Sequence, residues 1–135
     1  DLNRDWGFFT QLETKIINDD IMTSIKNNEA ILLIDFHSTI ENIFYIQNED
    51  DLKGYKFANE WLSKNSNNLK NYEYSIKPTV NKKNGVAKNY FNSVFSIPTI
   101  TYEVGDNTNR EAIKSAARKF ANSMMIILLN DDSTT

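Results

Sequence analysis

Apolar residues recur at helical spacing near both ends of the chain and predict two amphipathic helices. The first helix is expected over about residues 10–27, with an apolar stripe of Leu12, Ile16, Ile17, Ile21 and Ile25. The second is expected to close the chain, with an apolar stripe of Ile113, Ala117, Phe120, Ala121, Met124 and Leu128. Thr10 and Glu13 form an S/T-x-x-E capping box, which predicts where the first helix begins. Thr108 and Glu111 form a second such box before the last stripe.

Short apolar runs between these helices predict strands. Residues 30–34 are continuously apolar, as in a parallel strand buried on both faces, and polar residues follow at the carboxyl end of the run. Residues 43–46 and 72–76 are two further candidate strands. In residues 97–104 apolar and polar positions alternate, so that two faces are expected: Ile100, Tyr102 and Val104 against Thr99, Thr101 and Glu103.

Two more helices and a loop complete the expected elements. One helix carries Phe57, Trp61 and Leu62 toward the core, and a short one spans about residues 86–91. Residues 77–85 are predicted to form a loop, because Pro, Asn and Gly interrupt them and their charges are all positive. Helices that alternate with strands, some of them buried, indicate an α/β fold with a layered sheet.

Length and composition exclude several classes of protein. The 135 residues suffice for one domain with a sizeable core. A total of 15 Lys and Arg against 18 Asp and Glu gives a formal net charge of −3, which argues against nucleic acid as a partner. The absence of Cys excludes disulfides, thiolate zinc sites and cysteine nucleophiles. No apolar run approaches the roughly 18 residues of a membrane span, and the first residues lack the basic start and apolar middle of a signal peptide.

Candidate chemistry lies where α/β sheets place their ligands, at the carboxyl ends of strands. His37 is the only histidine, so it cannot build a His-rich zinc site, and a hydrogen-bonded structural role is the alternative. Glu103 is a strand glutamate among apolar neighbours, which calls for a cation, a hydrogen-bond network or a raised pKa, although a lateral salt bridge would also serve. Arg4 is suited to clamp a carboxylate, or else forms a surface salt bridge with Asp1 or Asp5.

Four segments spread over nearly the whole chain carry a resemblance to a known family. They are Asp1-Leu2-Asn3-Arg4-Asp5-Trp6-Gly7, Thr10-Gln11-Leu12-Glu13-Thr14, Ile34-Asp35-Phe36-His37-Ser38-Thr39 and Ile100-Thr101-Tyr102-Glu103-Val104-Gly105-Asp106. Their types and order resemble those of the zinc carboxypeptidase family, which includes the pancreatic carboxypeptidases A and B. The resemblance implies the C-terminal part of a mixed-sheet, three-layer fold of the phosphorylase/hydrolase-like kind.

The resemblance also implies roles for individual residues. Asn3 and Arg4 would bind the terminal carboxylate of a peptide substrate. His37 would be the last ligand of one zinc ion, and Glu103 would be the general base. The implied reaction is hydrolysis of the last peptide bond, in which the metal acidifies its water and polarises the carbonyl, and Glu103 passes the water's proton to the leaving amine.

The departures from the family pattern indicate which part of the family's catalytic domain residues 1–135 would correspond to. The family's first two zinc ligands, a His-x-x-Glu pair, and a second arginine lie upstream of the Asn-Arg motif, and this chain begins at that motif. The resemblance therefore implies the C-terminal portion of one catalytic domain, with the N-terminal part of that domain as its partner and no activity in isolation. The family's mobile-loop tyrosine has no match between Lys77 and Lys88, although Tyr72, Tyr74 and Tyr90 flank this segment.

Two alternative functions remain open. Residues 1–4 and 103–105 also resemble signatures of the aspartoacylase and succinylglutamate desuccinylase group, which would cleave small acylated amino acids. A non-catalytic binding module that keeps the fold without its metal is the other alternative. A His-x-x-Glu pair and a second arginine in the upstream sequence would favour an enzyme.

Three lysines bear on the substrate. By the family resemblance, Lys82, Lys83 and Lys88 lie in or beside a loop that covers the pocket for the substrate's last side chain. A positive pocket would favour a C-terminal Glu or Asp, or an acidic peptidoglycan-like stem peptide. The alternative is that all three lysines point into solvent, where screening leaves them little influence.

Overall fold

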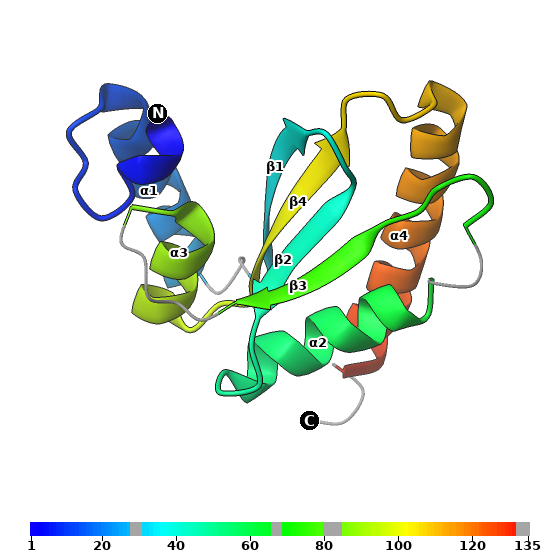
Figure 1. The fold of residues 1–135 in the computed structure, drawn as a ribbon. Helices are drawn as coiled ribbons and strands as arrows, with labels where there is room; N and C mark the ends of the chain where they lie inside the picture. Colours follow the sequence, from blue (N-terminus) through cyan, green and yellow to red (C-terminus); the bar gives the residue numbers. More distant parts are fainter. Residues whose placement is uncertain (28–30, 66–68, 80–84, 132–135) are drawn as a thin grey trace.

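The computed structural model describes residues 1–27, 31–65, 69–79 and 85–131, and it has an α/β fold built on a mixed four-stranded sheet. The strands are β1 (Leu33–Thr39), β2 (Ile43–Gln47), β3 (Ser75–Thr79) and β4 (Thr99–Gly105). The helices are the short 3-10 helix η1 (Leu2–Arg4), α1 (Leu12–Lys26), α2 (Leu52–Ser63), α3 (Ala87–Phe95) and α4 (Arg110–Asp131). Helices α1 and α3 lie on one side of the sheet, and α2 and α4 lie on the other (Figure 1).

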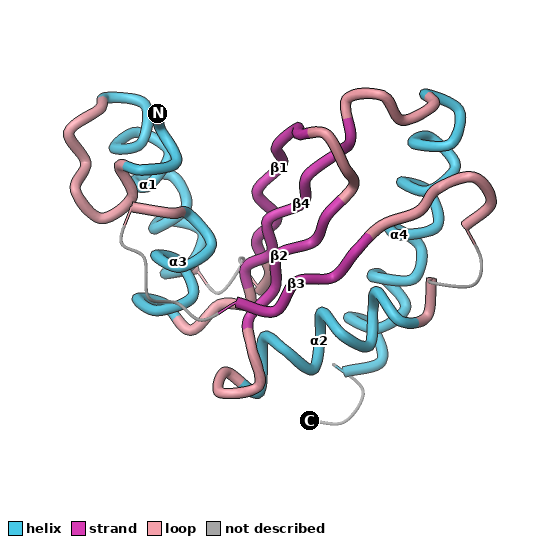
Figure 2. Tube along the Cα trace, viewed as in Figure 1, coloured by secondary structure: helices cyan, strands magenta, loops and turns pink. Residues whose placement is uncertain are grey.

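The strand order is β1-β4-β2-β3. The four strands lie side by side in one sheet (Figure 2). Strand β4 is parallel to β1 and antiparallel to β2, while β2 and β3 are parallel. The two central strands are therefore β4 and β2, and β1 is an edge strand. The predicted strand at 30–34 is shifted in the structure: β1 begins at Leu33 and continues through His37 to Thr39. The prediction that it is buried on both faces is wrong, because the edge position leaves Phe36 67% exposed.

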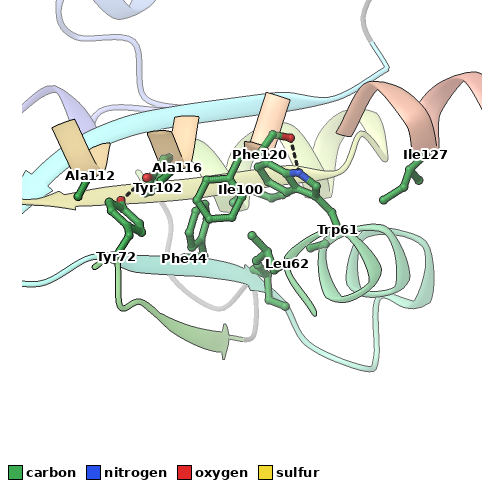
Figure 3. Close-up of a cluster of buried hydrophobic side chains, with 12 residues drawn as sticks. Phe44, Trp61, Leu62, Tyr72, Ile100, Tyr102, Ala112, Ala116, Phe120 and Ile127 are labelled. Atoms are coloured by element: carbon green, nitrogen blue, oxygen red, sulfur yellow. Dashed lines mark hydrogen bonds between the residues drawn. The ribbon is translucent and has the colours of Figure 1, made fainter. Parts of the chain in front are cut away.

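The hydrophobic core lies between the sheet and helices α2 and α4 (Figure 3). Phe44 of β2 is fully buried, and its ring stacks on Tyr102 of β4 with 4.1 Å between centroids. The indole N–H of Trp61 donates to the carbonyl of Phe120 at 2.8 Å, which ties α2 to α4. The two buried hydroxyls of Tyr72 and Tyr102 are also hydrogen-bonded. Because buried polar groups cost free energy unless they are paired, these bonds allow aromatic residues with polar ends to fill the core.

The apolar stripes of the two long helices are only partly as predicted. On α4 the buried residues are Ala112, Ala116, Phe120 and Ile127, whereas Ala117 and Ala121 are exposed. On α1, Leu12 and Ile16 are 68% and 58% exposed, so the predicted stripe does not enter this core. Helix α1 contacts α3 instead, where the Tyr90 hydroxyl donates to Asn18 at 3.2 Å. Within the described ranges, no helix is long and apolar enough to cross a membrane.

Both predicted capping boxes are wrong, although both helices start close to the predicted places. The carboxylate of Asp5 accepts the backbone N–H groups of Thr10 and Gln11 and the hydroxyls of Thr10 and Thr14. At the start of α4, the side chain of Asn109 accepts two backbone N–H groups, those of Glu111 and Ala112, at 2.9 and 3.1 Å. Asn109 therefore satisfies free N–H groups at the start of α4, whereas Asp5 fixes the segment Thr10–Gln11 that leads into α1 and reaches its first turn only through the Thr14 hydroxyl.

The middle of the chain differs from the prediction in register. Strand β3 lies three residues later than the predicted 72–76 and includes Lys77 and Pro78, which were expected in a loop. Proline is tolerated there because β3 is the other edge strand and its N–H face need not be paired. The predicted helix at 86–91 extends to Phe95 in α3. Lys82 and Lys83 lie outside the described residues.

Candidate functional site

A pocket of about 910 Å3 opens on the face of the sheet opposite the aromatic core. Strand β4 has two faces, and its pocket face presents Thr101 and Glu103 while Ile100 and Tyr102 enter the core. Segments from η1, all four strands and the start of α3 contribute to the walls, which are lined by Asp1, Asn3, Arg4, His37, Tyr45, Asn48, Pro78, Thr79, Val86, Lys88, Asn89, Thr101 and Glu103. All four residues to which the sequence assigned roles, Asn3, Arg4, His37 and Glu103, therefore line one pocket.

His37 and Glu103 come together through strand pairing. They are partners in the parallel register of β1 and β4, so their side chains leave the same face of the sheet one strand apart. Sixty-six residues of sequence separate them, and the pairing of two short strands removes that separation. The side chain of His37 is 30% exposed, which leaves the imidazole accessible from the pocket.

The imidazole of His37 is held by a carboxylate on its own strand. Nε2 of His37 lies 2.7 Å from Oδ2 of Asp35, two residues earlier on the same face of β1. A carboxylate oxygen only accepts, so a contact this short requires a proton on Nε2 of His37. Histidines that ligate metals commonly donate their other ring N–H to a carboxylate in this way. Sequence reasoning overlooked Asp35, although its spacing of two from His37 was a usable signal.

Asn3 connects the first turn of the chain to both neighbouring elements. Its Oδ1 accepts the backbone N–H of Ala87 at the start of α3, at 2.8 Å. This bond fixes the orientation of the amide and leaves Nδ2 at 3.2 Å from Nε2 of His37. Because Nε2 already donates to Asp35 and Nδ2 can only donate, this approach is a packing contact and not a hydrogen bond. The η1 segment is also paired with Gly85, whose carbonyl accepts the N–H of Trp6 at 3.2 Å. Together these contacts place Asn3 and Arg4 at the pocket.

Arg4 lies at the open side of the pocket. Its side chain is 64% exposed, and its nearest carboxylate is that of Asp1 at 4.0 Å, also well exposed. Its Nη1 donates to the backbone carbonyl of Asn3 at 2.6 Å. An exposed ion pair of this length contributes little free energy, about 0–1 kcal/mol, so it does not compete strongly with an incoming carboxylate. The expected alternative pairing with Asp5 is not found, because the Asp5 carboxylate accepts the backbone N–H groups of Thr10 and Gln11 instead.

Glu103 carries a buried carboxylate oxygen at the pocket. One of its carboxylate oxygens, Oε2, is buried and has no hydrogen-bond partner among the residues that the structure describes. Nor does any described cation lie within ion-pair distance of it, so the lateral salt bridge considered from the sequence is not found in this part of the chain. A buried carboxylate oxygen without a partner is costly, and such groups concentrate where a protein handles ligands or protons.

A complete metal site is not formed by the residues that the structure describes. Among them, no group of three or more His, Cys, Asp or Glu side chains is arranged to hold a metal ion. A catalytic zinc site takes three protein ligands with one open position. Among the described residues, His37 and Asp35 are thus not joined by the further side chains that such a site needs.

Lys88 lies in the first turn of α3 and lines the same pocket. Lys88 is only 3% exposed, so its side chain does not point into solvent. Burial lowers the pKa of Lys88 to about 8, against the carboxylate of Asp51, which acts to raise it. The expectation that all three lysines share one role is untested for Lys82 and Lys83, which are outside the described residues.

Four tyrosines bear on the missing loop tyrosine: the three that flank residues 77–88 and one that lines the pocket. Tyr72 and Tyr74 are in the core, where burial raises the pKa of both hydroxyls. Tyr90 packs against Trp6 and Phe9 beside α1. Tyr45 of β2 lines the pocket as the register partner of Thr101 in β4, and sequence reasoning did not single it out.

Comparisons with known proteins support the fold. No protein-family model matches the chain, and no curated protein matches it by sequence. Among solved structures, the chain is similar to a metallo-carboxypeptidase from Burkholderia cenocepacia, with a TM-score of 0.63 and 17% sequence identity. The match covers 99% of this chain and 39% of that protein, so this chain spans less than half the length of its structural neighbour. The chain therefore has a carboxypeptidase-like fold and corresponds to the C-terminal part of it.

Proposed function

We propose that the chain is the C-terminal portion of a zinc-dependent metallocarboxypeptidase-like hydrolase, which releases the last residue of a peptide. One observation carries the proposal: the histidine and glutamate singled out from the sequence are register partners on adjacent strands of one pocket. The fold likeness supports the class of enzyme, and the Asn3–His37 contact adds the substrate-binding segment to the same place.

The residues of this chain would divide the work as follows. Arg4, with its planar guanidinium at the open side of the pocket, binds the terminal carboxylate of the peptide. Glu103 takes a proton from the attacking water and gives it to the leaving amine. His37 contributes one zinc ligand, its tautomer set by Asp35, and we place the remaining ligands on polypeptide outside residues 1–135.

Exposed apolar side chains support the idea that more polypeptide completes the domain. Leu12 and Ile16 on α1 and Ile31, Phe36 and Ile40 along β1 are all more than half exposed. β1 is also the outermost strand of the sheet, and no described strand pairs with its outer edge. An open strand edge beside exposed apolar residues is a surface that proteins usually cover. In this proposal the covering element is the N-terminal part of the same catalytic domain.

The test is an activity comparison between the full-length natural protein and the 135-residue chain. With zinc, the full-length protein is expected to release C-terminal residues from blocked dipeptides. The 135-residue chain alone is expected to bind Zn2+ weakly in calorimetry and to release no C-terminal residue from the dipeptides. The reason is that one imidazole cannot supply the three protein ligands of a catalytic zinc site. Tight, stoichiometric zinc binding by the 135-residue chain alone would contradict the proposal that the other zinc ligands lie outside residues 1–135.

The same assay separates the other functions. Hydrolysis of N-acetyl-aspartate with no action on blocked dipeptides would assign the protein to the aspartoacylase-like group. A folded full-length protein that binds peptide ends and cleaves neither substrate would be a binding module. Replacing Asp35 with Asn tests the zinc role of His37, since it should weaken zinc binding of the full-length protein by about 10-fold or more.

A further inference from the structure

Asp5 follows Arg4 in the sequence and connects the start of the chain to α1. It is buried, with 6% of its surface exposed. One oxygen of its carboxylate accepts the backbone N–H and the hydroxyl of Thr10. The other oxygen accepts the backbone N–H of Gln11 and the hydroxyl of Thr14. Four donors from the chain just before and inside α1 therefore converge on this one side chain.

The backbone of Asp5 strengthens the same connection. Its N–H donates to the carbonyl of Leu2 at 3.1 Å, and its carbonyl accepts the N–H groups of Phe8 and Phe9 at 3.0 and 2.9 Å. Phe9 has a φ of +53°, which is the left-handed conformation that a bulky residue avoids. Such a conformation persists only where the surrounding contacts hold it. The segment between η1 and α1 therefore depends on Asp5 for its shape.

Arg4 has few restraints of its own. Its side chain is 64% exposed, and the nearest carboxylate, that of Asp1, lies 4.0 Å away. It belongs to η1, a single turn of three residues with non-helical φ and ψ at Asn3, and so short a helix is not stable by itself. The residues that hold η1 therefore decide where the guanidinium lies. On the α3 side these are Asn3 and Trp6, and on the α1 side the residue is Asp5.

The direction of the Asp5 carboxylate also keeps Arg4 available. An aspartate beside an arginine would otherwise pair with it and compete with an incoming carboxylate. In the part of the chain that the structure describes, no cation lies within ion-pair distance of Asp5. Its charge is satisfied by neutral donors instead, while Arg4 lines the pocket.

We propose that Asp5 is a positioning residue, which holds η1 in the conformation that lets Arg4 take the terminal carboxylate of a peptide. Thr14 acts through Asp5, although Thr14 is 1% exposed, lies on α1 and does not line the pocket. This inference rests on the proposed function, because that function assigns Arg4 to the terminal carboxylate. His37 and Glu103 are held by strand pairing, so their work should not depend on Asp5.

The test compares two ligands that differ only in the group that Arg4 would bind. Phenylacetate and phenylacetamide have the same shape, and neither contains a peptide bond, so the full-length natural protein is used with its metal. Both are titrated by calorimetry into the wild type and into Asp5→Asn, Thr14→Val, Thr14→Ser and Arg4→Met. Thr23→Val is the matched control, because the Thr23 hydroxyl lies on the same helix and donates to the carbonyl of Asp19 instead.

The wild type is expected to bind the acid about 10-fold or more tightly than the amide. Asp5→Asn and Thr14→Val should reduce this ratio by about 3-fold or more, whereas Thr14→Ser and Thr23→Val should keep it. Thr14→Val removes a single hydroxyl, so it serves as the test if Asp5→Asn does not fold.

The ratio separates positioning from two simpler effects. Loss of stability alone does not change it, because a smaller folded fraction weakens the binding of both ligands by the same factor. Loss of the negative charge in Asp5→Asn would by itself strengthen binding of the acid, which is the opposite of the expected result. Thr14→Val changes no charge at all.

Kinetics on a blocked dipeptide give a second measurement. Asp5→Asn and Thr14→Val should raise KM about as much as they weaken binding of phenylacetate, with kcat changed by less than about 2-fold. A loss that falls mainly on kcat would overturn the positioning role, because it would mean that the reacting groups are disturbed.

The outcomes also separate this inference from the proposed function. If the wild-type ratio survives in folded Asp5→Asn and Thr14→Val but is lost in Arg4→Met, the inference about Asp5 is overturned and the role of Arg4 stands. If Arg4→Met keeps the wild-type ratio, or if the wild type does not prefer the acid, then both the inference and the proposed role of Arg4 are wrong.

Discussion

His37 of β1 and Glu103 of β4 are register partners in a parallel pair of strands, and both line one pocket. The rigid sheet sets their separation, so neither residue depends on a loop for its position. Constellations of this kind are most precise when they are built on strands or helices. A conservative substitution of His37 or Glu103 is expected to leave the strand pairing intact, because the pairing uses backbone groups. The role of each side chain can therefore be tested by itself.

Replacing Glu103 with Gln tests the general-base assignment. Gln keeps the size and most of the hydrogen bonding of Glu but has no basicity. In the full-length protein this change is expected to lower kcat by about 100-fold or more with little effect on KM. A folded variant with nearly normal kcat would reassign Glu103 to a structural role. Thr101→Val, on the same face of β4, is the control and should affect kcat far less.

The parts of the fold that were predicted correctly are those decided by local pattern. The alternation in residues 97–104 predicts β4 and the two faces of its side chains, because a central strand must separate apolar from polar positions. The edge strand β1 was misjudged, since its burial depends on what lies beside it rather than on its own residues. The apolar run at 30–34 looks the same at an edge as in the centre of a sheet.

The parts of the site that were not predicted are decided by tertiary contacts. The Thr10 box does not form because Thr10 bonds to Asp5 instead, whose carboxylate accepts the N–H groups of Thr10 and Gln11 just before α1 and the hydroxyl of Thr14 in its first turn. The burial of Lys88 follows from the packing of α3 against β4, which no local pattern reports. Asn3, by contrast, was found through its place in a motif.

Asp5 should make the stability of the chain sensitive to acid. Burial acts to raise the pKa of Asp5, but the hydrogen bonds from Thr10, Thr14 and Gln11 outweigh it and lower the pKa well below its ordinary value of 3.8. The unfolded chain therefore takes up the proton first, so this stabilisation is fully present above about pH 4 and is lost as pH falls further. Urea unfolding of the wild type at about pH 6 and about pH 3 should show the loss.

Asp5→Asn should lower the urea midpoint at pH 6 and reduce the difference between the two pH values. Asp19→Asn, an exposed aspartate on the same helix, is the matched control and should behave like the wild type. An equal pH dependence in all three proteins would show that Asp5 is not the group responsible.

Gly85 should be hard to replace because it touches the backbone of Arg4. Its φ is +88°, and a Cβ at this position would lie 2.4 Å from the Arg4 carbonyl oxygen. Gly85→Ala is therefore expected to cost more free energy of unfolding than the roughly 1–2 kcal/mol of left-handed strain alone, and to raise KM by displacing Arg4.

Gly7→Ala provides the comparison for Gly85. Gly7 has nearly the same φ, +91°, but its Cβ would meet only the Tyr90 side chain at 3.2 Å. Its cost should be close to the strain alone, with KM unchanged, as measured by urea unfolding and peptide kinetics. If both alanine variants behave alike, the contact between Gly85 and Arg4 does not position the arginine.

The exposed apolar residues of α1 give a prediction that depends on the length of the protein. Leu12→Gln and Ile16→Gln place a good helix former at positions that are 68% and 58% exposed. In the 135-residue chain these changes should alter the free energy of unfolding by no more than about 0.5 kcal/mol and improve solubility. Phe44→Ala, in the fully buried core, should cost about 3–5 kcal/mol in the same chain.

In the full-length protein the same two glutamine variants should become destabilising by about 1.5–3 kcal/mol each, because the rest of the domain would cover these side chains. Thr23→Gln, on an exposed position of α1, is the control and should be neutral in both lengths. Urea unfolding of both proteins measures the difference. If Leu12→Gln and Ile16→Gln are as neutral in the full-length protein as in the short chain, this face of α1 is not the surface on which the N-terminal part packs.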